Sequence, residues 1–312
     1  MPFSTIFNTP IVTLSQFFRI LTLEPSLICM RLEAQKLNKR SYPYIILVTI
    51  AIFLALGAAS MALNKVFEDR LSQGHMMEYM FFTGLVQVVL SAIVIQIMKK
   101  NQVFYADEFT SRGLREGLDL GWLAYIFSAA LFTLNCLGQD RSLFTRPSFL
   151  SILIVLFSAL ATGFFEEVLV RGFVLNSINE KLQGVPGRTK KAMLISSAIF
   201  ALAHLLNLFM NPDFFFVIAN VIQAFMMGLY LSAIYVRTSN LIAPSLIHGI
   251  VDFATFILYA ILSPEALSSM MNAPQPEPTG SSWVTFFVQI AITVPFLISG
   301  LLMMKKVDDK TA

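Results

Sequence analysis

Charged residues are scarce in this chain of 312 residues. Asp, Glu, Lys and Arg make up only 13% of it, whereas hydrophobic residues make up 56%. A soluble domain usually carries about a quarter charged residues, so this chain lacks the polar surface that a water-soluble protein needs. Its few charges gather in short clusters between long apolar runs, which is typical of repeated membrane crossings. The composition therefore predicts an all-α, polytopic membrane protein in contact with membrane lipids.

Cysteine is nearly absent, and this excludes two further classes of protein. Cys29 and Cys136 lie far apart and form no CxxC pattern, which argues against a disulfide framework and against a thiolate zinc site. Basic residues interleaved with aromatic ones are also missing, so we expect no nucleic-acid partner. The first basic residue is Arg19, and the start of the chain therefore lacks the positive region of a signal peptide.

Eight apolar segments are long enough to cross a bilayer, which requires about 20 residues each. They are Tyr44–Leu63, Tyr79–Met98, Leu120–Leu137, Phe149–Ser177, Ala192–Met210, Phe214–Val236, Leu241–Leu262 and Trp283–Met304. Residues 1–41 are predicted to be a cytoplasmic or interfacial leader. Residues 42–312 are predicted to form a single transmembrane domain.

The distribution of positive charge predicts the orientation of the helices. With eight spans, both termini lie on one side of the membrane, and that side holds 18 of the 22 Lys and Arg residues. Because cytoplasmic loops are enriched in Lys and Arg, both termini are predicted to be cytoplasmic. We expect a multi-pass protein of a bacterial or archaeal cell (inner) membrane.

Ionisable residues inside the spans are candidates for function, because burying them costs several kcal/mol. Glu166, Glu167 and Arg171 lie in the fourth span, His204 in the fifth, and His248 with Asp252 in the seventh. Glu167 and Arg171 are four residues apart, so they share a helix face and can form an ion pair. His248 and Asp252 have the same spacing. The helical rise places these groups at similar depths, and we expect them to converge.

The order of these motifs resembles that of a known family. Glu166-Glu167-Val-Leu-Val-Arg171, Phe200-Ala-Leu-Ala-His204 and His248-Gly-Ile-Val-Asp252 match EExxxR, FxxxH and HxxxN/D on successive membrane helices. This is the pattern of the CPBP family, which contains the type II CAAX prenyl endopeptidases and bacteriocin-processing enzymes. The resemblance covers a core at about residues 148–262.

The resemblance implies an intramembrane endopeptidase of the metal-independent glutamate type, with its site facing the cytoplasmic side. Glu166 with His204 would activate a water molecule, and His248 would donate a hydrogen bond to the oxyanion. Asp252 and Glu167 join the implied catalytic set, and Arg171 pairs structurally with Glu167. Substrates would be protein or peptide termini near the cytoplasmic leaflet, with or without a lipid, and no cofactor is implied.

Two alternatives stay open on the sequence. Glu166, His204 and His248 are also a credible set of zinc ligands, which would make the protein a zinc metallopeptidase, although no HExxH motif is present. The second alternative is a protein that keeps the fold without catalysis, such as a transport subunit, an immunity protein or a scaffold.

Overall fold

A computed structural model describes residues 41–209, 213–272 and 280–307, and the predicted leader at 1–41 lies almost entirely outside them. The described chain is helical throughout, with one isolated bridge between Phe144 and Leu262. The α-helices are α3 (Tyr42–Val66), α4 (Glu68–Ser72), α5 (Met77–Lys100), α6 (Leu114–Leu120), α7 (Trp122–Leu137), α8 (Phe149–Glu167), α9 (Asn176–Lys181), α10 (Arg188–Ala203), α11 (Phe214–Thr238), α12 (Ile242–Phe256), α13 (Leu258–Ile261), α14 (Pro264–Asn272) and α15 (Gly280–Lys305).

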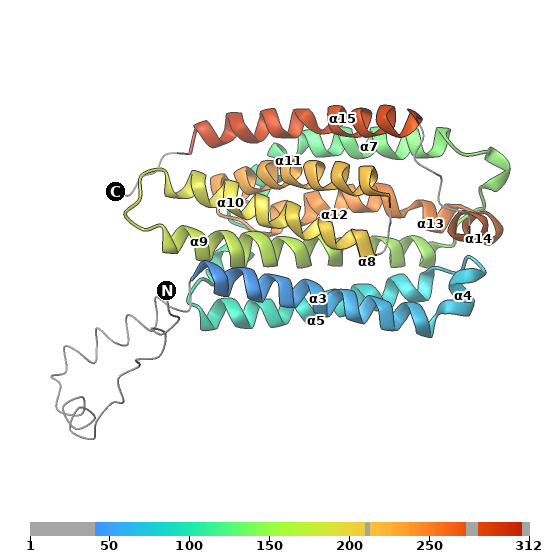
Figure 1. Cartoon of the computed structure of the whole chain (residues 1–312), viewed down its shortest axis with the longest axis horizontal. Coiled ribbons are helices and arrows are strands. Elements are labelled where there is room, and N and C mark those ends of the chain that lie inside the picture. The colour runs from blue at the N-terminus through green and yellow to red at the C-terminus, as the bar shows by residue number, and fades with distance from the viewer. Residues whose placement is uncertain (1–40, 210–212, 273–279, 308–312) are drawn as a thin grey trace, which may run out of the picture.

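The predicted spans agree with these helices. Within the described ranges, seven helical segments are long and apolar enough to cross a membrane, and α6 with α7, bent by 51°, supplies an eighth if the pair forms one span. The protein is therefore an integral, multi-pass membrane protein. The long helices run side by side, and the start of α3 and the end of α15 lie at the same end of the bundle (Figure 1).

Local sequence signals start several of these helices. Ser41, Ser148 and Asp213 cap α3, α8 and α11 by accepting a hydrogen bond from a backbone N–H of the first turn. Asn240 does the same for α12, since its side-chain oxygen accepts from Ala243 N at 2.8 Å. The Asn240 side-chain nitrogen also donates to the carbonyl groups of residues 110 and 112, which ties the start of α12 to the loop before α6.

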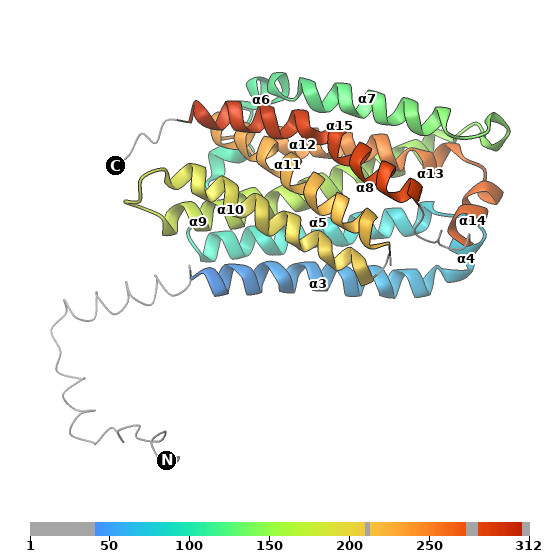
Figure 2. The same ribbon diagram turned by 45° about the horizontal axis from the view of Figure 1, so that its top comes forward.

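The centre of the bundle is the long segment that begins with α8. It continues through a π-helix, η3 (Val168–Leu175), into α9, and every residue of the π-helix is buried. α8 packs against α12 and α5, and η3 packs against α5 and α10. Figure 2 shows this segment passing between α5 on one side and α12 on the other. A short 3₁₀-helix, η4 (His204–Phe209), ends the α10 segment.

Candidate active site

A buried ion pair lies at the junction of α8 and η3. Arg171 donates from Nη1 to Glu167 Oε1 at 2.8 Å, and both side chains are fully buried. Arg171 Nη2 donates to the backbone oxygen of Gly228 on α11 at 2.7 Å, and the guanidinium lies over the Phe200 ring at 5.3 Å. A buried carboxylate of this kind requires a compensating charge. The predicted pair is therefore present, and it joins α8, α10 and α11.

His248 connects this ion pair to the second glutamate. Its Nδ1 lies 2.9 Å from Glu167 Oε1, and its Nε2 lies 3.5 Å from Glu166 Oε2. The side chains of His248 and Glu166 are 10% and 17% exposed, so both are nearly buried but can be reached by a small molecule. A carboxylate that accepts a hydrogen bond from one ring nitrogen fixes the orientation of the imidazole and leaves the other nitrogen for chemistry. Glu167 is in position to orient His248, and Glu166 lies at the opposite ring nitrogen.

Two glycines allow this approach of α8 to α12. A Cβ atom added to Gly163 would lie 2.5 Å from Gly249 N and 2.7 Å from the Ser245 oxygen, and one added to Gly249 would lie 3.0 Å from the Leu160 Cα. Small residues at a crossing let helix backbones approach closely inside a membrane. Because Gly163 is one turn before Glu167 and Gly249 follows His248, this contact sets the distance between the two side chains.

His204 is positioned by the end of α10. Its Nδ1 lies 3.0 Å from the Phe200 carbonyl oxygen. A carbonyl only accepts, so Nδ1 carries the hydrogen and the neutral ring keeps a lone pair on Nε2. Phe200 packs edge-on against both imidazoles, with ring centroids at 4.8 Å from His204 and 6.1 Å from His248. The two histidines predicted to act together therefore both contact one phenylalanine.

A cavity of about 440 Å³ opens beside the histidines. His204, His248 and Asp252 contribute to its wall, and Glu166 lies behind His248 without lining it. The other walls come from α7, α11 and α15. This volume falls within the range of small-molecule and peptide sites. The cavity, with ionisable groups at one end, is a candidate substrate site.

Asp252 faces this cavity from α12, one turn beyond His248. Its Oδ2 atom is buried and has no hydrogen-bond partner within the described residues. A buried polar atom without a partner is costly and calls for a role. The structure thus brings Asp252 into the same group as His204 and His248, where a substrate or a water molecule can complete its hydrogen bonding.

The cavity extends toward one end of the bundle. The wall uses the first half of α11, from Phe216 to Met227, and the later part of α12, from His248 to Thr255. The cavity therefore extends from the histidines toward the end of the bundle where α11 begins, which is opposite to the start of α3 and the end of α15 (Figure 1).

The zinc alternative does not fit this geometry. In the part of the chain that the structure describes, no three His, Cys, Asp or Glu side chains are arranged to hold a metal ion. The ring nitrogens of His248 face Glu167 and Glu166, and Nδ1 of His204 faces a backbone carbonyl. We therefore derive no step through a metal from Glu166, His204 and His248.

Several lining residues would not be identified from motifs alone. In the sequence, Asn220 and Gln223 are typical of helix-packing residues that could also line a peptide channel, and Gln289 and Thr293 on α15 carry no motif. All four line the cavity. Their shared signal is an amide or hydroxyl side chain inside an apolar span. Such residues commonly hydrogen-bond between helices, and Gln223 does so by donating to the Gln289 backbone oxygen at 2.7 Å.

One comparison with known proteins gives a match. Residues 146–254, about a third of the chain, match the family described as type II CAAX prenyl endopeptidase Rce1-like. This segment includes α8 to α11 and most of α12, and thus every ionisable residue of the cluster described above. No curated protein and no solved structure matches the chain.

Proposed function

We propose that this protein is a membrane-embedded endopeptidase of CAAX-processing type, because residues 146–254 match the Rce1-like family of type II CAAX prenyl endopeptidases, a protease family. Its substrates are protein or peptide termini near the cytoplasmic leaflet, with or without a lipid. One observation carries the proposal: the His248 ring lies between Glu167, at 2.9 Å, and Glu166, at 3.5 Å.

The proposed reaction is hydrolysis without a covalent intermediate. Glu166 takes a proton from a water molecule that the Nε2 lone pair of His204 helps to orient. The hydroxyl oxygen adds to the scissile carbonyl carbon, and a proton then passes to the amide nitrogen as the C–N bond breaks. The products are one carboxylic acid and one amine, and the proton balance is closed. Positioned general bases of this type contribute about 10²–10⁴-fold to a rate.

His248 is proposed to stabilise the oxyanion of the tetrahedral intermediate. Its Nδ1–H donates to Glu167, so Nε2–H of the protonated ring can donate to developing negative charge. Asp252 lies next to it and supports this role as a proton carrier or as a partner of the imidazole. No metal ion takes part in this scheme.

The test is peptide cleavage by the purified protein in detergent micelles. A mixture of dodecapeptides rich in Ala, Leu, Phe, Gln and Ser serves as the probe, and mass spectrometry detects the products. We expect Glu166→Gln to lose at least about a thousandfold in kcat/KM, and wild-type activity to persist with a zinc chelator. Glu78→Gln, outside the lining of the candidate substrate cavity, is the matched control and should cleave normally. Equal cleavage by wild type and a folded Glu166→Gln protein would leave the non-enzymatic alternative instead.

A further inference from the structure

A second cavity lies at the end of the bundle where α4, α5, α8 and α14 meet. Its volume is about 490 Å³, which is within the range of small-molecule sites. None of its described lining residues is shared with the candidate substrate cavity. Three candidate membrane spans end beside it, at Met77, Phe149 and Ile261. The cavity therefore lies at the depth where the spans leave the hydrocarbon core and lipid headgroups begin.

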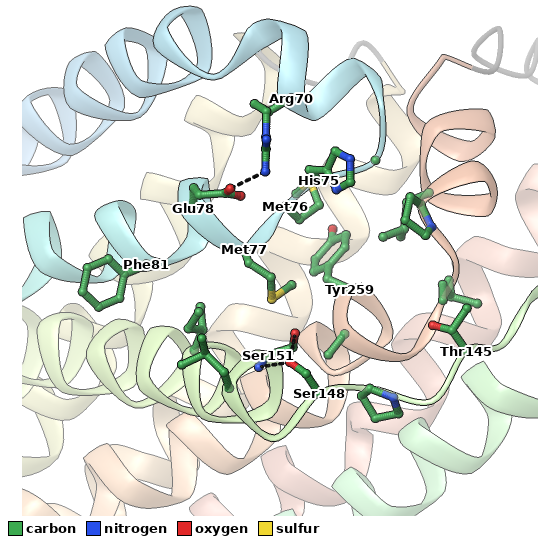
Figure 3. A pocket seen from close by; sticks show the side chains of 18 of the residues that line it. Arg70, His75, Met76, Met77, Glu78, Phe81, Thr145, Ser148, Ser151 and Tyr259 are labelled. Atoms are coloured by element: carbon green, nitrogen blue, oxygen red, sulfur yellow. Dashed lines mark hydrogen bonds and ion pairs between the residues drawn. The ribbon is translucent and has the colours of Figure 1, made fainter.

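The polar part of this lining is rich in hydrogen-bond donors. Arg70 on α4 donates from Nη2 to Glu78 Oε1 on α5 at 2.5 Å. A guanidinium has five N–H donors, so this pair leaves donors of Arg70 for a ligand. Figure 3 shows the pair on one side of the cavity and the hydroxyl groups of Ser148 and Ser151, from α8 and its cap, on the other. Donors thus face the cavity from two sides.

The charges of the lining do not cancel. Arg70 is balanced by Glu78, whereas Arg146, in the connection before α8, has no hydrogen bond or ion pair among the residues that the structure describes. His75 also lines the cavity, and it interacts electrostatically with Glu265, a residue of α14 outside the lining. The guanidinium of Arg146 therefore leaves the lining with one uncompensated positive charge, which favours a singly charged anion.

Next to the polar part, the cavity has an apolar wall that faces the lipid. Phe81 and Phe82 on α5 and Leu150 on α8 line it and are 39%, 43% and 65% exposed. Ile154, one turn further along α8, continues this wall. Exposed apolar side chains of a membrane span contact acyl chains, which are as apolar as leucine. A ligand that fills the whole cavity needs one charged end and one apolar end.

We propose that this cavity binds an anionic phospholipid from the leaflet at this end of the bundle. The phosphodiester balances the charge of Arg146 and accepts hydrogen bonds from Arg146 and Arg70, because guanidinium groups bind phosphate oxygens through paired N–H donors. One acyl chain lies along Phe81, Phe82 and Leu150, where burial of its methylene groups adds to the affinity. This inference does not depend on the proposed endopeptidase function.

Thermal unfolding of the full-length protein in micelles of a neutral detergent measures binding, because a ligand of the folded state raises its stability with concentration. The probes are dioleoylphosphatidylglycerol, dioleoylglycerol, which lacks the phosphate, and glycerophosphoglycerol, which lacks the acyl chains. We expect the phospholipid to bind at least about tenfold more tightly than either fragment. Equal binding of glycerophosphoglycerol would indicate a site for soluble phosphate esters, and equal binding of dioleoylglycerol an apolar groove without phosphate recognition. Either result would overturn the proposal.

Substitution of Arg146 distinguishes this site from general contact with lipid. Arg146→Gln should weaken the binding of dioleoylphosphatidylglycerol about tenfold, since hydrogen bonds between guanidinium and phosphate are strong, and Arg146→Glu should weaken it further. Arg141→Gln is the matched control, because it removes an exposed cation in η2 (Arg141–Leu143), outside the lining, and it should bind like the wild type. The proposal fails if folded Arg146→Gln and Arg146→Glu proteins bind the phospholipid like the wild type, or if Arg141→Gln loses as much affinity as Arg146→Gln.

Discussion

Two buried glutamates in this protein connect neighbouring segments, but they are neutralised in different ways. Glu167, in the middle of the bundle, has the guanidinium of Arg171 at 2.8 Å and the imidazole of His248 at 2.9 Å. Glu108 lies in η1 (Ala106–Phe109), outside the spans, where Tyr235 and Asn176 contact its carboxyl group. No cation is in contact with Glu108 within the described residues. The first glutamate is compensated by a fixed charge, whereas burial raises the pKa of the second and so favours its protonated form.

Proton counting supports this reading of Glu108. The Tyr235 hydroxyl is in hydrogen-bond contact with Glu108 Oε1 and lies 2.9 Å from Asn176 Oδ1. One hydroxyl proton serves one acceptor at a time, so a protonated Glu108 allows both contacts to be satisfied. Burial raises the pKa of Glu108 from 4.5 to about 7, against the smaller opposing effect of the hydrogen bonds from Tyr235 and Asn176. The comparison of Glu167 with Glu108 indicates that this fold accommodates a buried carboxyl group when a counter-ion or a proton accompanies it.

The largest expected effect comes from removing the fixed counter-ion. Arg171→Met removes the fixed counter-ion of the buried Glu167 and leaves it only the His248 contact, which should lower the free energy of unfolding by about 3–5 kcal/mol. Thermal unfolding in detergent micelles measures the loss. Glu167→Gln/Arg171→Met should recover at least half of it, because no charge is then left uncompensated.

The matched control is an exposed ion pair. Arg70 and Glu78 lie 2.5 Å apart, but their side chains are 54% and 40% exposed. Arg70→Met should therefore cost less than about 1 kcal/mol. A loss in Arg171→Met no larger than that in Arg70→Met would mean that the central pair does not neutralise Glu167 as described.

The second prediction concerns the proton on Glu108. Its pKa is higher in the folded state than in the unfolded chain, so the folded state binds this proton more tightly. The resulting stabilisation is complete below the unfolded pKa of 4.5 and is lost as the pH rises through about 7. Between pH 5 and 7 the free energy of unfolding should fall by about 2 kcal/mol.

A neutral substitution isolates this effect. Glu108→Gln should flatten the pH dependence between pH 5 and 7, as followed by denaturant unfolding at each pH. Glu116→Gln removes a carboxylate that pairs with Arg237 at the exposed surface, and it should leave the slope intact. If the slope survives in Glu108→Gln, another group is responsible for it.

Much of the fold follows from the sequence, because a bilayer demands apolar helices of a fixed length. The predicted span Phe214–Val236 is α11 with two residues fewer. The ion pair of Glu167 with Arg171 also follows, since residues four apart share a helix face. The catalytic roles of Glu166, Glu167, His204, His248 and Asp252 stay predictions, although the structure brings their side chains together.

Other features depend on contacts between distant segments, which one sequence does not specify. The π-helix at Val168–Leu175 has the composition of an ordinary helix. In the sequence, the loop containing Glu108 has the pattern of an amphipathic interfacial segment. Nothing in that pattern predicts the contact of Glu108 with Tyr235, which lies 127 residues away. The bend between α6 and α7 is likewise not specified by the sequence alone.

The smallest expected effect on stability comes from a change at the close contact between α8 and α12, which positions Glu167 and His248. Gly163→Ala adds a methyl group that would lie 2.5 Å from the backbone nitrogen of Gly249, so α8 and α12 must move apart. Overpacking of this kind costs about 1–2 kcal/mol. The Glu167–His248 hydrogen bond should lengthen with it, and kcat/KM should fall by about tenfold or more, because small displacements of positioning groups are costly to catalysis. The Glu108 cluster does not depend on this crossing, so the pH dependence of stability should persist.

Gly57→Ala is the matched control, since no atom lies within 4 Å of the added methyl group. Normal activity in Gly163→Ala would show that the glycine contact does not set the position of His248.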